Sequence, residues 1–284
     1  MNPRTARLRQ ESLDAVPTIS AERALLLTEF TRENLGRHST PLLRALSFRD
    51  LCERKTLFLG EGELIVGERG PRPKAVPTYP ELTCHSLEDL RILDSRPKTW
   101  YRVAPEVLAA YEETVIPFWR GRSMRDQIFP ALPPEWHAAY AAGVFTEFME
   151  QRAPGHTVLD DKVYRKGMNA FRRDVAAALA ALDFERDAEA IDKKEELLAM
   201  DVACEALVLF AGRHAALADE KAAVEPDPAR RAELLRVAAV CRRVPAEPPR
   251  DFHEALQMYW FCHLGVITEL NGWDAFSPGH LDQH

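Results

Sequence analysis

A chain of 284 residues, of which 46% are hydrophobic and 29% charged, has the composition of a globular protein, which excludes the fibrous and disordered classes. Its formal net charge of −7 excludes a nucleic-acid-binding surface, because phosphate binding needs clustered Lys and Arg, whereas here the basic residues alternate with acids. Residues 1–10 lack the apolar core of a signal peptide, and no run of about 18 apolar residues occurs that would span a membrane. We therefore expect a cytoplasmic protein with neither membrane nor nucleic acid as a partner.

The five cysteines indicate a reducing compartment. They are odd in number, lie far apart and form no C-x-x-C pair, so the sequence predicts neither a disulfide framework nor a zinc site. Cys204 and Cys262 fall in helical, apolar contexts and are interpreted as small hydrophobic residues. We expect no bound metal and no bound cofactor.

The N-terminal segment, residues 1–56, is predicted to be a helical lead-in. Ser20 is a candidate N-cap for a helix that ends near Gly36, and Pro41 suits the first turn of the next helix. The pattern changes over residues 57–81. Two short apolar runs separated by residues 60–63 (GEGE) predict a β-hairpin over 57–66, and closely spaced Gly and Pro residues predict an extended chain over 67–81.

Residues 82–249 are predicted to form a helical shell. Ser86 begins a capping motif, and Pro105 suits the first turn of a further helix. The Ala-, Leu- and Glu-rich half that follows predicts helices over about 160–183, 186–222 and 228–243, with a break at residues 226–228 (PDP). These residues alone leave a simple helical bundle open as an alternative.

The last segment, residues 250–284, combines a buried helix with polar groups. Asp251 is a candidate N-cap, and apolar residues on nearly every side of the following helix predict that it is buried all round. Residues 266–268 (VIT) favour a short strand over 264–270, followed by an irregular segment that carries Asp274, His280 and Asp282. The chain stops soon after these polar residues without a closing element, so we expect it to be truncated at its C-terminus.

Four stretches carry a resemblance to a known family. They are residues 252–257 (FHEALQ) with Trp260 and Phe261, residues 277–283 (SPGHLDQ), residues 271–276 (NGWDAF) and residues 155–157 (GHT). With them the chain resembles the glycyl radical enzymes of the pyruvate formate-lyase superfamily. Within the eliminase branch it is most similar to those that remove water from trans-4-hydroxy-L-proline. The likeness runs over the whole chain, and such enzymes are much longer, so residues 1–284 would be an N-terminal part.

The resemblance implies a fold and a reaction for the complete enzyme. The fold would be an α/β barrel of ten strands, to which this mainly helical part contributes the shell and a first strand. The reaction would give pyrroline-5-carboxylate through a glycyl radical, which a radical S-adenosylmethionine activating enzyme installs under anaerobic conditions, in a homodimer. The radical cysteine of the family lies in a Gly-Cys-x-Glu loop. Cys204 and Cys241 lack that context, so we expect this chain alone to lack the radical machinery and to be inactive.

Two residues are the candidate site. His156, in a Pro- and Gly-rich loop, matches a pocket histidine of the family, and an imidazole with a pKa near 6.5 can donate a proton to a departing hydroxyl. Asp274 stands in apolar company, where an ionised carboxylate needs a partner such as a substrate ammonium. The resemblance assigns catalysis and substrate binding to His156, and substrate binding to Asp274. A loop histidine and a loop-capping aspartate are the structural alternatives.

Two other functions stay open. One keeps the family and changes the substrate, to a diol for dehydration or to a small polar molecule whose C–S or C–N bond is cleaved. Asp274 discriminates, because a carboxylate suits an amine and repels a sulfonate. The other is a helical scaffold without catalysis, which would expose no large apolar face.

Overall fold

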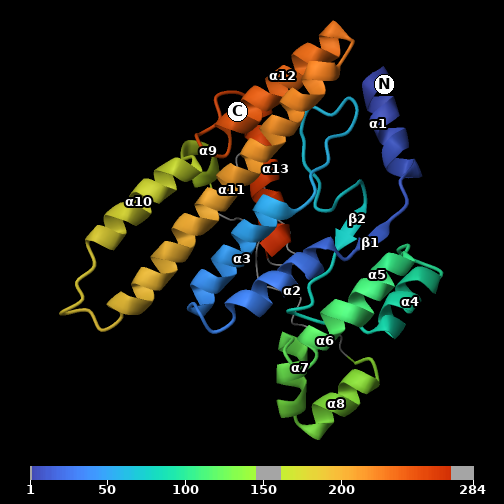
Figure 1. Ribbon diagram of the computed structural model, residues 1–284, viewed down its shortest axis with the longest axis vertical. Coiled ribbons are helices and arrows are strands. Elements are labelled where there is room, and N and C mark those ends of the chain that lie inside the picture. The colour runs from blue at the N-terminus through green and yellow to red at the C-terminus, as the bar shows by residue number, and fades with distance from the viewer. Residues whose placement is uncertain (1, 145–160, 270–284) are drawn as a thin grey trace.

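The computed structural model describes residues 2–144 and 161–269, most of which are helical (Figure 1). A π-helical turn (Tyr111–Val115) joins α5 (Pro105–Ala110) to α6 (Ile116–Trp119), and a 3₁₀ turn (Phe129–Ala131) follows α7 (Met124–Ile128). Two short strands, β1 (Thr18–Ser20) and β2 (Ala75–Pro77), pair in parallel. The helices are α1 (Pro3–Asp14), α2 (Glu22–Asn34), α3 (Thr40–Arg54), α4 (Leu87–Ser95), α5 (Pro105–Ala110), α6 (Ile116–Trp119), α7 (Met124–Ile128), α8 (Pro134–Ala141), α9 (Lys162–Arg165), α10 (Met168–Ala180), α11 (Ala190–Val224), α12 (Pro228–Arg243) and α13 (Phe252–Glu269).

The longest described helix, α11, is the scaffold of the molecule. At 35 residues it is about 50 Å long, and α3, α10 and α12 all pack along it (Figure 1). The chain reverses between α11 and α12 at residues 225–227, where the Asp227 carboxylate accepts the backbone N–H of Ala229 over 3.0 Å. The largest core cluster lies where α3, α11, α12 and α13 meet, around Phe48, Phe210, Leu234, Phe261 and Leu264.

Helix boundaries predicted from caps and prolines are largely confirmed. Ser86 and Asp89 form the predicted capping box, and Pro105 begins α5.

The helix predicted over 160–183 is interrupted between α9 and α10 at Gly167. A Cβ there would lie 2.2 Å from the Ala246 carbonyl oxygen, so only glycine lets the two backbones approach this closely. The backbone N–H of Met168 then donates to the carbonyl of Pro245 over 2.8 Å.

The predicted hairpin over 57–66 is wrong, because this segment contains no strand. Its backbone groups form hydrogen bonds with side chains of α12 and α13. The Gln257 amide accepts from the N–H of Val66 over 2.8 Å and donates to its carbonyl over 2.9 Å, and Arg230 donates to the carbonyls of Gly60 and Glu63. These contacts satisfy groups that a second strand would otherwise pair with, so the chain crosses the helices through turns and bends without forming a strand.

The strand predicted over 264–270 is also wrong as far as the structure describes it, because α13 continues to Glu269. The β-branched residues Val266, Ile267 and Thr268 favour a strand only weakly. Continuing the helix buries Leu264 and Ile267 in the main core, and this burial outweighs the local preference.

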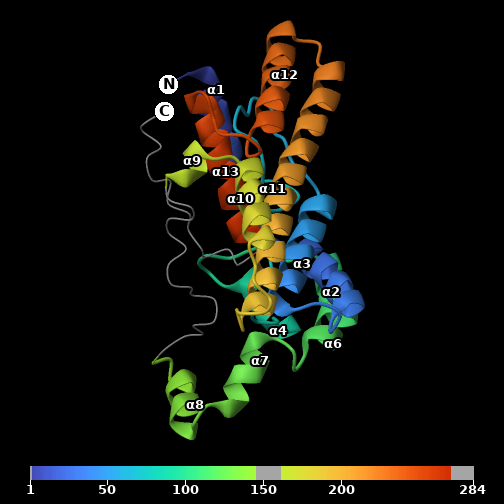
Figure 2. The ribbon, with the colours of Figure 1, turned by 90° about the vertical axis from the view of Figure 1, so that its left-hand side faces the viewer.

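The described sheet joins two segments that the sequence analysis kept apart. Thr18 lies opposite Ala75 and Ser20 opposite Pro77, so the Pro-rich segment is held against the start of α2. α7 and α8 lie at the end of the molecule opposite the α11–α12 turn (Figure 2). No helix in the described part of the chain is long and apolar enough to cross a bilayer.

Candidate functional site

The helix that leads to the predicted site, α13, begins at a strong cap. Asp251 accepts the backbone N–H of Glu254 over 2.9 Å, as its position in the sequence predicts. Glu254 is fully buried and forms ion pairs with Arg243 and Arg250. Burial opposes ionisation, but the hydrogen bonds from Arg250 outweigh it and keep the pKa of Glu254 below its usual value. The start of the helix is therefore fixed to the end of α12 and to the segment that joins the two helices.

One polar stripe along α13 binds the backbone of residues 64–67. A His253 ring nitrogen lies 2.8 Å from the carbonyl of Leu64, Gln257 pairs with both backbone groups of Val66, and the Trp260 indole N–H donates to the carbonyl of Gly67 over 2.8 Å. The three side chains recur at four- and three-residue spacing and so share one face of the helix. This stripe was not predicted from the sequence, although a Gln at helical spacing from His253 on a mostly apolar helix is a signal for it.

Arg23 holds the C-terminal turn of α13. Its Nε donates to the carbonyl of Thr268 over 2.7 Å, and one terminal nitrogen reaches the carbonyl of Glu269 over 3.3 Å. The guanidinium also makes two hydrogen bonds to the carboxylate of Glu81, and its centre lies 4.1 Å from the ring centroid of Tyr79. Burial by itself would lower the pKa of Arg23, but the negative charge of Glu81 outweighs this effect and the pKa is raised above its usual value. A cation is thus placed against carbonyls at the C-terminal end of the described part of α13, where a helix dipole is negative.

The two candidate site residues, His156 and Asp274, both lie outside the described residues. The structure does place the elements beside them. Asp274 follows α13 in the chain, and His156 precedes α9, which packs on α13 through Val163 and Tyr164. Hence the described segments nearest to the two candidates in the sequence belong to one packed unit.

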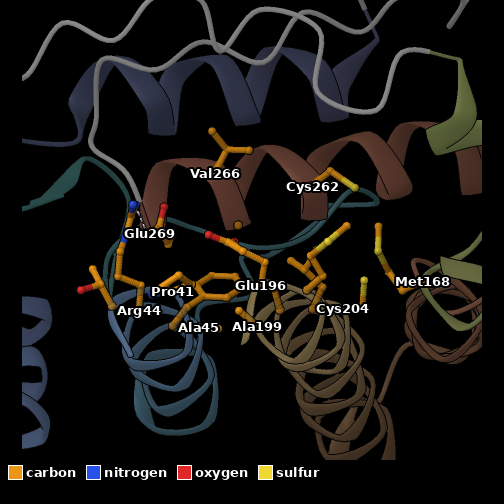
Figure 3. Close-up of a pocket in the computed structure, with 16 residues that line it drawn as sticks. Pro41, Arg44, Ala45, Met168, Glu196, Ala199, Cys204, Cys262, Val266 and Glu269 are labelled. Carbon is orange, nitrogen blue, oxygen red and sulfur yellow. Dashed lines mark hydrogen bonds and ion pairs between the residues drawn. The ribbon is translucent and has the colours of Figure 1, made fainter. Parts of the chain in front are cut away.

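An apolar groove runs between α3, α11 and α13 (Figure 3). It has a volume of about 680 Å³. Arg44 and Glu269 lie side by side at its edge and form an ion pair, so the charge of that carboxylate is matched. The side chains that line the groove are mostly apolar and include Phe48, Met168, Met200, Leu207, Cys262 and Val266.

A family model described as "Pyruvate formate lyase-like" matches residues 1–284. The chain belongs to this family. Trans-4-hydroxy-L-proline dehydratase of Clostridioides difficile is 50% identical over 281 residues, which cover 99% of this chain and 36% of that protein. Isethionate sulfite-lyase of Desulfovibrio desulfuricans is 32% identical over 295 residues, which cover 100% of this chain and 35% of that protein.

The fold agrees with a solved structure. A crystal structure of hydroxyproline dehydratase from Clostridioides difficile, with trans-4-hydroxy-L-proline bound, matches with a TM-score of 0.93 and 49% identity. The match covers 99% of this chain and 36% of that one. This chain of the pyruvate formate lyase-like family therefore spans about a third of the length of the relatives it matches. The family predicted from four short motifs is confirmed.

Three cysteines of this family member are buried, and Cys84 and Cys204 are partly buried. Burial raises the pKa of Cys52, Cys241 and Cys262 to about 12, and of Cys84 and Cys204 to about 11. Within residues 2–144 and 161–269, no three His, Cys, Asp or Glu side chains gather closely enough to hold a metal ion.

One buried basic pair lies beneath the stripe on α13. His214 is fully buried, and its Nδ1 lies 2.9 Å from the carbonyl of Phe210, which can only accept, so Nδ1 carries the hydrogen. Burial lowers the pKa of His214 to about 4. Lys55 donates to the carbonyls of Glu68 and Arg69, and burial lowers its pKa to about 8. Lys55 thus holds the segment that crosses α13 at residues 68–69, while His214 packs against the ring of Phe261 on α13.

Proposed function

We propose that the chain is the N-terminal part of a glycyl radical dehydratase that converts trans-4-hydroxy-L-proline to pyrroline-5-carboxylate and water. The observation that supports this substrate most strongly is 50% identity to a hydroxyproline dehydratase across nearly the whole chain, against 32% to an isethionate lyase. Both relatives are matched over a similar share of their own length, so unequal coverage does not explain the difference between the two identities.

The proposal gives His156 and Asp274 separate roles. Asp274 binds the secondary ammonium of the substrate, because a carboxylate in an apolar setting is stabilised by a cation. His156 donates a proton to the departing hydroxyl, a step that suits an imidazole whose pKa is near neutral. What supports this pairing in the described residues is that α9 and α13, next to the two candidates in the sequence, pack together.

The radical chemistry of the proposal belongs to a longer protein. The radical cysteine and glycine would lie beyond residue 284, and a radical S-adenosylmethionine enzyme would be the activating partner, acting on a cytoplasmic homodimer. The five cysteines of this chain support this view, because each is at least partly buried and none has the sequence context of the radical cysteine. By itself, the 284-residue chain would bind no cofactor and would be inactive.

The alternatives are less well supported. A sulfonate substrate such as isethionate would be repelled by Asp274, and a diol would leave that carboxylate without a cation. A non-catalytic helical scaffold is disfavoured by the 50% identity to a dehydratase across nearly the whole chain.

The test uses the longer protein, activated anaerobically by its radical S-adenosylmethionine enzyme. Supplied with trans-4-hydroxy-L-proline, it should form pyrroline-5-carboxylate, and isethionate should yield no sulfite.

We expect His156→Gln to lower kcat by about a hundredfold or more, and Asp274→Asn to raise KM by about tenfold or more. His38→Gln, at an exposed position, is the matched control and should change neither. Absence of product from a protein that carries its glycyl radical would refute the substrate, and sulfite release would favour the lyase alternative.

A further inference from the structure

We propose that the apolar groove between α3, α11 and α13 is a docking surface, and that its occupant is polypeptide that follows residue 284 in the longer protein. The inference rests on the proposed longer protein but is independent of its substrate. It concerns a surface that the roles of His156 and Asp274 do not involve.

The chemistry of the groove argues against a small polar ligand. Its lining is mostly apolar, its carboxylates Glu196 and Glu269 would repel another carboxylate, and Arg44 is already paired with Glu269. A zwitterion such as hydroxyproline would lose its hydration there and gain no free charged partner for its carboxylate. A volume of about 680 Å³ instead suits several apolar side chains packed together.

Exposure on the groove side of α11 supports a missing packing partner. Met200 is 54% exposed although it lines the groove, and Cys204, one turn further along the same helix, is only partly buried. An unbranched methionine side chain adapts readily to whatever packs on it. Burying such residues removes apolar surface from water, which stabilises the covered state in proportion to the area.

The length of the relatives and the path of the chain identify the occupant. This chain covers only 36% of the hydroxyproline dehydratase it resembles, so about two thirds of such a protein must pack against surfaces of the remainder. Glu269, the last residue of α13, itself lines the groove. The described part of the chain therefore ends at the edge of the groove.

The test measures thiol labelling in the longer protein. Cysteines are introduced one at a time as Met200→Cys, inside the groove, and as Ile191→Cys, which is the matched control on the same helix. Ile191 is 69% exposed and does not line the groove. With Cys84 and Cys204 replaced by serine, we expect maleimide to modify the cysteine at 200 at least about tenfold more slowly than the one at 191, because a covered thiol is inaccessible.

The same pair in the 284-residue chain completes the experiment. There the two cysteines should react at comparable rates at low protein concentration. Equal rates in the longer protein would overturn the proposal. Protection in the 284-residue chain that grows with protein concentration would also overturn it, in favour of a second copy as the occupant. A longer protein that is labelled as expected but does not dehydrate hydroxyproline would refute the proposed substrate and leave this inference standing.

Discussion

Arg23 and Thr268 are 245 positions apart in the sequence, yet the Arg23 Nε donates to the Thr268 carbonyl over 2.7 Å. The contact ties α2 to the last turn of α13, and Glu81 neutralises the guanidinium that makes it. The end of the helix that leads to Asp274 is thus positioned by a residue near the other end of the chain.

Replacing Arg23 should therefore be costly. Arg23→Met leaves Glu81 without its cation and the carbonyls of Thr268 and Glu269 without their donor, so we expect a loss of about 3–5 kcal/mol in the free energy of unfolding. Arg172→Met is the control, because Arg172 makes a similar two-bond ion pair with Asp201 at a more exposed place. It should cost at most about 1 kcal/mol, as measured by urea unfolding. Equal losses would contradict the special role of Arg23.

Gly167 tests the backbone contact between the start of α10 and the segment before α13. A Cβ at this position would lie 2.2 Å from the Ala246 carbonyl oxygen and 2.4 Å from the Glu247 Cα, and backbone atoms cannot rotate away. We expect Gly167→Ala to lower the free energy of unfolding by about 3 kcal/mol or more. Gly212→Ala, in the exposed middle of α11 with open space around it, should raise it by up to about 1 kcal/mol. Thermal unfolding of both variants gives the comparison.

Comparing alanine substitutions at Gly67 and Gly36 separates the cost of steric crowding from the cost of backbone strain. Gly67 and Gly36 both have positive φ, +118° and +80°, so alanine is strained at either position. A Cβ at Gly67 would also meet the Leu264 Cδ1 at 2.6 Å, whereas nothing lies within 4 Å at Gly36. Gly36→Ala should cost about 1 kcal/mol, and Gly67→Ala about 1–3 kcal/mol more. Similar urea midpoints for the two variants would show that Leu264 moves aside freely.

His214 predicts how stability depends on pH. Its pKa is lowered to about 4 in the folded protein, so the unfolded chain, with an ordinary pKa near 6.5, binds the proton more tightly. The stabilisation is fully present above about pH 6.5 and is lost as the pH falls toward 4, by a few kcal/mol. His214→Gln, which keeps a donor for the Phe210 carbonyl, should reduce the dependence of the free energy of unfolding on pH. His38→Gln should leave this dependence unchanged. Urea unfolding at intervals between pH 4 and 7 measures the difference, and an unchanged slope in His214→Gln would contradict the assignment.

Local signals predicted the helices because a cap or a proline acts on its nearest neighbours. Asp251, Ser86 and Pro105 mark helix starts in any context that permits a helix, and all three do so here. The candidate residues His156 and Asp274 came from matching motifs, and their roles stay predictions. Neither Arg23 nor Gln257 has a local signal of comparable strength, since their partners are distant backbone groups.

The sequence by itself determined where most helices begin and end, and to which family the chain belongs, because caps, helical periodicity and motifs are properties of neighbouring residues. Only the tertiary structure decided that residues 57–66 cross α13 without forming a hairpin and that residues 266–268 stay helical. The physical reason is that the Gln257 amide satisfies the backbone of Val66 and that the core buries Ile267. Both effects depend on contacts between distant parts of the chain, and these outweigh weak strand propensities.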